Sequence, residues 1–177
     1  TEHTARASLP VLDGRASVGD LARLWGLVYV GNLLGGGLFA VSMVYLAPAY
    51  GIADTAAFAE IALNVADHGP WLLLAGGVLA GWLMGLLSWL LTAATESIAR
   101  IAVVWLVTTG IGLAHLPHSI AGNVEVLAGA LASPSISLAQ YVGFLALATV
   151  GNAIGGSVFV ALLKYGHIVR VGDEAAK

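Results

Sequence analysis

Long stretches of this chain carry no charged residue and are almost wholly apolar. A helix needs roughly 20 apolar residues to cross the hydrocarbon core of a bilayer. Four stretches without Asp, Glu, Lys or Arg are long enough, namely residues 24–53, 69–95, 101–124 and 126–163. Their most apolar parts predict complete membrane-spanning helices over residues 24–47, 70–94 and 137–164.

The third stretch and the start of the fourth predict a broken span. A continuous helix over residues 101–132 would be about 48 Å long at 1.5 Å per residue, whereas the hydrocarbon core is about 30 Å thick. Pro117 removes a backbone donor and disfavours helix before it, and Gly122 loosens the backbone. We therefore predict half-helices over residues 101–114 and 122–132, joined by a non-helical loop. Irregular backbone at membrane depth is tolerated where it lines a wet cavity, and broken helices commonly frame transport sites.

The few charged residues are unevenly distributed around the spans and predict an orientation. The connector over residues 51–69 contains acids but no Lys or Arg, and its apolar positions predict a short surface helix. The positive-inside rule puts residues 13–23, residues 95–100 and the C-terminal tail in the cytoplasm. The basic residues that decide this are Arg15, Arg23, Arg100, Lys164, Arg170 and Lys177.

Composition supports the membrane assignment and narrows the function classes. Hydrophobic residues make up 59% of the 177 residues and charged residues 10%, against about 25% charged in soluble domains. We expect a multi-pass protein of the inner (cell) membrane, with the lipid bilayer as a partner. The absence of cysteine excludes a thiolate metal site, and seven scattered Lys and Arg residues make no nucleic-acid patch. Without a His-Glu-x-x-His or Gly-x-Ser-x-Gly motif, we expect no enzyme, metal or cofactor.

An internal repeat links the first and last spans. Residues 31–39 and 151–159 share the pattern Gly-Asn-x-x-Gly-Gly-x-x-Phe at an offset of 120 residues. Close helix packing alone would explain the glycines, but the two spans are predicted to run in opposite directions, which is typical of an inverted-topology repeat. By this offset, residues 1–12 occupy the slot of the half-helix 122–132. The first copy then lacks one and a half helices, so we expect a fragment of a six-span protein.

These motifs, in this order, resemble the formate/nitrite transporter family. Besides the two glycine-rich copies, the resemblance rests on Gly81-Trp82-Leu83 and on Pro117-His118-Ser119-Ile120-Ala121-Gly122, and it covers nearly the whole chain. It implies an all-α polytopic membrane protein with an aquaporin-like inverted repeat, assembled as a homopentamer with one pore per protomer. It also implies passage of small monovalent anions such as formate, nitrite or hydrosulfide. By resemblance, His118 is the family's central histidine and Thr1 is the threonine beside it.

His118 is the residue on which the predicted mechanism depends. A bare carboxylate in an apolar constriction costs several kcal/mol. An imidazolium could supply a counter-charge, or a histidine with its ordinary pKa of about 6.5 could convert the anion into a neutral acid. A lone membrane histidine can instead be a hydrogen-bonded packing residue, but the helix break and the resemblance favour the pore. The half-helix starting near Gly122 would add a favourable potential for the anion.

The other candidate pore residues follow from the break, the repeat and the expected apolar gates. They are Ser119 and Gly122 beside His118, the gate residues Ile111 and Leu113, the repeated Asn32 and Asn152, Thr1, and Glu125.

Two positions depart from the family pattern and leave alternatives open. Thr95, followed by Glu96, stands where family members often carry a lysine. Glu125 lies where formate channels tend to be apolar. It either pairs with Arg100 or Arg6, or lines the pore and favours a protonated or cationic solute. A neutral-solute pore and a non-conducting structural membrane protein are therefore the alternative functions.

Overall fold

The computed structural model describes residues 11 and 16–175, with side chains as far as Val158. Every regular element in these residues is an α-helix. The elements in chain order are α3 (Val18–Ala49), α4 (Thr55–Ala66), α5 (Pro70–Ala93), α6 (Ser97–Leu113), α7 (Ser119–Ala132) and α8 (Leu138–Ala175).

Three of the helices in the described residues are long and apolar enough to cross a membrane. They are α3, α5 and the part of α8 over Leu138–Val158, and the 18-residue apolar stretches within them have mean hydropathies of 1.7, 1.8 and 1.4. The helices α6 and α7 are shorter, and a non-helical segment separates them where the broken span was expected. The short helix α4 forms in the acidic connector.

Helix caps move some boundaries away from the apolar pattern. The helix α3 begins at Val18 rather than near residue 24 because Ser17 and Asp20 form a capping box, with the amide of Asp20 donating to Ser17 Oγ at 3.0 Å. Similarly, α7 begins at Ser119 rather than at Gly122, because His118 caps it. The apolar pattern thus locates the part of a helix that can lie in the membrane, whereas the polar cap determines the residue at which the helix starts.

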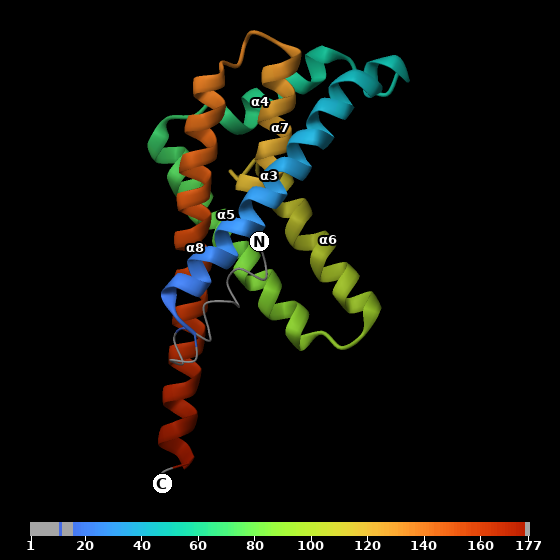
Figure 1. Ribbon diagram of the computed structural model, residues 1–177. Helices are drawn as coiled ribbons and strands as arrows, with labels where there is room; N and C mark the ends of the chain where they lie inside the picture. Colours follow the sequence, from blue (N-terminus) through green and yellow to red (C-terminus); the bar gives the residue numbers. More distant parts are fainter. Residues whose placement is uncertain (1–10, 12–15, 176–177) are drawn as a thin grey trace.

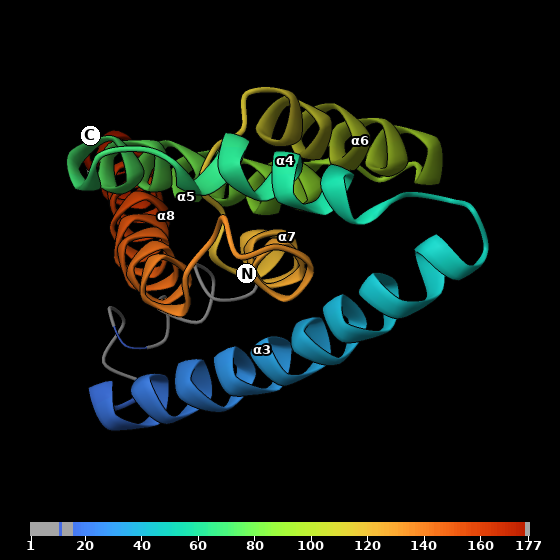
Figure 2. The ribbon, with the colours of Figure 1, turned by 90° about the horizontal axis from the view of Figure 1, so that it is seen from above.

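The helix α7 lies in the middle of the described bundle. It packs against α3, α4 and α8, while α5 and α8 pack along one another. Figure 2 shows α7 between α3 on one side and the layer of α4, α5 and α6 on the other. In Figure 1, α6 diverges from the bundle and α8 continues beyond the other helices. The core at the junction of α4, α5, α7 and α8 contains Ala62, Val65, Leu73, Val126, Ile136, Phe144 and Ala148.

Glycines of the second repeat copy let α8 contact the backbone of α5. A Cβ on Gly151 would come within 2.7 Å of the carbonyl oxygen of Leu74. A Cβ on Gly155 would overlap the carbonyl oxygen of Val78 and lie 2.8 Å from the amide nitrogen of Trp82. Because backbone atoms occupy this space, no larger residue fits without separating the helices.

One hydrogen bond joins equivalent positions of the two repeat copies. The Tyr29 hydroxyl lies 2.6 Å from Thr149 Oγ1, and the two residues are 120 positions apart. Equivalent residues of two related units contact each other where a two-fold axis passes between the units. The contact therefore supports an inverted relation between α3 and α8, with the pseudo-two-fold axis beside this pair.

We expect Gly155→Ala to destabilise the bundle, because the added methyl group meets backbone that cannot move independently of α5. The expected loss is about 1–3 kcal/mol of unfolding free energy. Thermal unfolding in detergent micelles measures it. The matched control is Gly143→Ala in the same helix, where a Cβ meets nothing within 4 Å. Equal melting temperatures for the two variants would contradict the packing described here.

Candidate permeation site

The chain breaks between α6 and α7 over a short irregular segment. The helix α6 ends at Leu113, and the amide of Leu116 donates back to the carbonyl oxygen of Ile111 at 3.1 Å. His115 adopts a φ of +47°, which is uncommon for a residue with a Cβ. This left-handed position lets the chain turn before Pro117. The non-helical segment thus runs from Ala114 to His118, with Pro117 and His118 at its α7 end.

His118 is the N-cap of α7, and the two nitrogens of its ring have different surroundings. Nδ1 accepts a hydrogen bond from the amide of Ala121 at 3.2 Å. Nε2 is buried and has no hydrogen-bond partner within the described part of the chain. An accepting Nδ1 puts the proton of the neutral ring on Nε2. His118 therefore presents a buried N–H donor whose acceptor is not among these residues.

Asn152 fastens this break to two membrane-spanning helices. Its Oδ1 accepts a hydrogen bond from the amide of Ser119 at 2.8 Å. Its Nδ2 donates to the carbonyl oxygens of Gly77 and Pro117, both at 2.9 Å. Asn152 and Ser119 are both buried. One amide group on α8 thus holds the segment on both sides of His118 and also holds α5.

A cavity of about 270 Å³ lies beside this junction, between α3, α5, α8 and the first residues of α7. Its wall is mostly apolar. The two repeated asparagines both line it, although Asn32 donates its Nδ2 to the carbonyl oxygen of Val28 in its own helix. The remaining polar lining includes Tyr29, Ser119, Thr149 and Ser157.

The other predicted pore residues do not gather around the cavity. Ile111 is buried, whereas Leu113 is 77% exposed at the end of α6, and neither residue lines the cavity. Gly122 is in the first turns of α7 rather than at its start, and a Cβ there would overlap the ring of Phe144. Its role in the structure is therefore close packing against α8. Thr1 lies outside the described residues.

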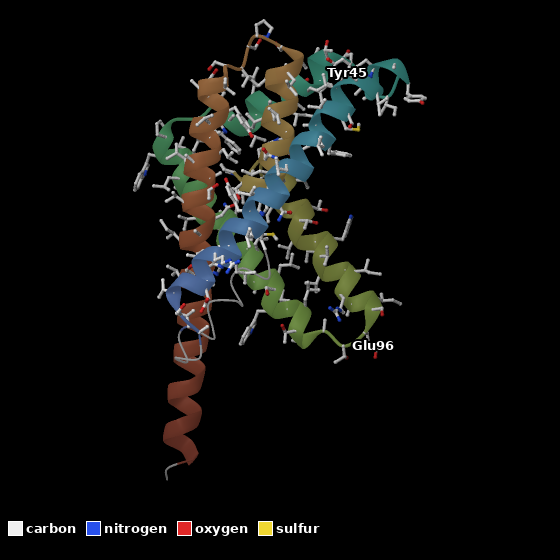
Figure 3. All side chains as sticks on the ribbon, viewed as in Figure 1. Tyr45 and Glu96 are labelled. Carbon is white, nitrogen blue, oxygen red and sulfur yellow. The ribbon has the colours of Figure 1, made fainter. Side chains whose placement is uncertain are left out.

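Glu125 is half-buried in α7. No hydrogen bond or ion pair to it is present among residues 16–158. Arg100, the partner suggested from the sequence, is in the first turn of α6 on the far side of the break. Figure 3 labels Glu96, which directly precedes α6, low in the view, whereas Tyr45 on α3 lies near the top. Arg6, the other suggested partner, lies outside the described residues.

Two polar contacts at the site escaped the sequence analysis. One is the Tyr29–Thr149 pair, which the repeat offset of 120 could have identified. The other involves Asn123, whose Nδ2 donates to the carbonyl oxygen of Leu33 at 3.3 Å and whose Oδ1 accepts from the Tyr141 hydroxyl at 2.6 Å. This buried amide ties α7 to both α3 and α8, and no local pattern in the sequence marks it.

Comparison with protein families gives one match that covers most of the chain. The sequence model of the formate/nitrite transporters matches residues 1–166. Among solved structures, a channel described as an FNT family ion channel superposes with a TM-score of 0.79 at 25% sequence identity. That superposition covers 94% of this chain and 67% of the solved one.

Three similar curated proteins are membrane proteins or transporters by name. The inner membrane protein YfdC of Escherichia coli is 33% identical over 171 residues, covering 95% of this chain and 54% of YfdC. The uncharacterized transporter YrhG of Bacillus subtilis is 27% identical, covering 93% of this chain and 62% of YrhG. A probable formate transporter of Methanothermobacter thermautotrophicus is 29% identical, and the match covers 89% of this chain and 63% of that transporter. The chain thus spans between about half and two thirds of the length of these relatives.

We expect Asn152→Ala to loosen the break around His118. The substitution leaves one buried amide and two buried carbonyl groups without their partner, at a cost of about 1–3 kcal/mol for each group that finds no substitute. Hydrogen exchange at the amides of Ser119 to Ala121 should accelerate, and the melting temperature in detergent should fall.

The control is Asn32→Ala, which removes the equivalent asparagine in the first repeat copy. Its amide bonds only within its own helix in the described structure. If both variants exchanged Ser119 at the wild-type rate, Asn152 would not be the fastening described here.

Proposed function

Because the chain belongs to the formate/nitrite transporter family, we propose that the protein is a membrane channel or transporter for small monovalent anions of weak acids, such as formate or nitrite. Family and fold are those of transporters and channels rather than of enzymes. The whole protein acts as the pore, with the region around His118 as its narrow, selective part.

The observation that carries this proposal is the unpartnered Nε2 of His118. A buried N–H without an acceptor costs about 1–3 kcal/mol, and such a group in a native protein calls for a functional explanation. An anion at this position would accept the hydrogen bond and recover the cost. A hydrogen bond to a charged acceptor contributes about 1.5–3 kcal/mol, which offsets part of the anion's desolvation in the membrane.

The ring geometry favours polarisation of the anion over its protonation by His118. A second proton on the imidazole would have to bind Nδ1, which accepts the amide proton of Ala121. Protonation would therefore break the cap of α7. The neutral ring keeps the cap and still donates from Nε2. The N-terminus of α7, which begins at the next residue, adds its positive dipole end on the same side of the break.

Several finer features belong to the same proposal. Thr1 would face His118 across the pore, and Ile111, which is buried near the end of α6, would contribute to an apolar gate. The protein would be a homopentamer of the cell membrane with a cytoplasmic C-terminus, as the distribution of Lys and Arg and the family resemblance imply.

Flux measurements on the full-length protein in liposomes test the role of His118. We expect His118→Ala to lower formate uptake about ten- to a hundredfold, the equivalent of one lost charged hydrogen bond. His118→Asn should retain much of the flux, because asparagine can both cap a helix and donate an N–H.

The two variants separate the two mechanisms proposed for the histidine. Asparagine does not titrate, so a complete loss of flux in His118→Asn would favour proton transfer by the imidazole. If liposomes containing the wild-type protein passed glycerol or ammonia but no formate or nitrite, the protein would instead be a pore for neutral solutes.

A further inference from the structure

The hydrogen-bonded pair of Tyr29 and Thr149 connects α3 with α8 inside the cavity beside the break. Both side chains line that cavity, and both are half-buried. Each of the two helices packs against α7, whereas α3 and α8 do not pack extensively on one another as far as the structure describes them. The hydrogen bond of 2.6 Å therefore joins two walls of the cavity rather than two helices in continuous contact.

A second hydrogen bond fixes which residue of the pair is the donor. The Thr149 hydroxyl donates to the carbonyl oxygen of Leu145 in its own helix at 2.6 Å. Because a hydroxyl group has one hydrogen and two acceptor sites, Thr149 Oγ1 accepts the other hydrogen bond. Tyr29 is thus the donor, and its O–H points at Thr149.

The position of Thr149 on α8 brings the pair close to the break. Thr149 lies three residues before Asn152, which in a helix means the same face and a rise of about 4.5 Å. Asn152 holds the backbone on both sides of His118. Ser119, the residue after His118, lines the cavity together with Tyr29. The Tyr29 hydroxyl therefore belongs to the same junction as the histidine.

Tyr29 can release its hydrogen at little cost to the structure. If its O–H turns away, Thr149 keeps its bond to Leu145. Rotation about the C–O bond is enough for this, so the ring need not move. The amide of Asn152, which also lines the cavity, has no such freedom, because it serves three backbone groups that would all lose their partner.

A small anion in this cavity would compete effectively for the Tyr29 hydrogen. The cavity wall is mostly apolar, so an anion there lacks most of the donors that it has in water. A hydrogen bond to an ionised acceptor is roughly twice as strong as one between neutral groups. The Thr149 hydroxyl is neutral, so an exchange of partners favours the anion. The cavity volume of about 270 Å³ leaves room for a small anion, since a water molecule takes up about 30 Å³ in the liquid.

We propose that Tyr29 is an anion-binding residue of the permeation path, and that Thr149 holds its O–H while the cavity is empty. An entering formate or nitrite accepts the hydrogen bond in place of Thr149, and Thr149 accepts it again when the anion leaves. The proton stays on Tyr29 throughout, so no covalent bond forms or breaks. This proposal rests on the proposed function and adds a second donor to the one assigned to His118.

Formate uptake into liposomes containing the full-length protein, measured over a range of formate concentrations, tests this with two variants of nearly unchanged shape. Tyr29→Phe removes the O–H that would bind the anion. It should raise the half-saturating formate concentration about five- to tenfold, which corresponds to the difference between a charged and a neutral hydrogen bond. Thr149→Val removes the competing acceptor and should lower that concentration up to about fivefold.

The opposite directions of these two shifts distinguish anion binding from a structural role. Both variants delete the same hydrogen bond, so both should lower the melting temperature in detergent slightly and by similar amounts. A pair that served only to hold α3 beside α8 would change the half-saturating concentration in the same direction in both variants. The matched control is Tyr45→Phe, which alters an exposed tyrosine near the C-terminal end of α3 and should behave as the wild type.

The outcomes also separate this inference from the function on which it rests. Suppose that His118→Ala lost formate uptake, while Tyr29→Phe and Thr149→Val left the half-saturating concentration unchanged or moved it in the same direction. Tyr29 would then not bind the anion, and the anion-channel function would stand. If the wild type passed no anion at any concentration, both proposals would be overturned.

Discussion

The arrangement of the break between α6 and α7 depends on the hydrogen bonds of the Asn152 side-chain amide. Its three hydrogen bonds join α8 to α5 and to the backbone on both sides of His118. A segment with an irregular backbone has no internal ladder of hydrogen bonds, so its shape at membrane depth must be imposed from outside. A side-chain amide suits this purpose because it has two donors and an acceptor in one rigid plane.

The glycines of the second repeat copy make this contact possible. Asn152 reaches the carbonyl oxygen of Gly77 only because α8 lies directly against α5, and that approach requires Gly151 and Gly155 to lack side chains. Close packing and the polar contact are therefore two aspects of one interface. In its second copy the Gly-Asn-x-x-Gly-Gly motif supplies both, with Asn152 bonding across the interface that Gly151 and Gly155 allow. The cavity beside the junction is lined by Asn32, the asparagine of the first copy of the motif on α3.

The amino-acid sequence predicts the helical class, the long apolar helices and the location of the break well, because all three depend on hydrophobic length and on Pro117. It predicts helix starts less well. Ser17 and His118 extend α3 and α7 beyond the apolar runs through cap hydrogen bonds, and a histidine is not a usual cap. The long-range contacts of Asn123 were not predictable from local patterns. Gly122 was interpreted as the start of a half-helix, but its proximity to Phe144 depends on how two distant segments pack.

The contact between Tyr29 and Thr149 has a consequence for the history of the fold. In a symmetric dimer of identical halves, a position on the two-fold axis faces its own copy, so the pair would have to be two tyrosines or two threonines. Two tyrosines would compete for the same space, and two threonines would leave a gap between the helices. A large residue opposite a small one fits this space only when the two halves have different sequences. Divergence at this position therefore makes the two halves non-interchangeable, since neither half could take the place of the other in this contact.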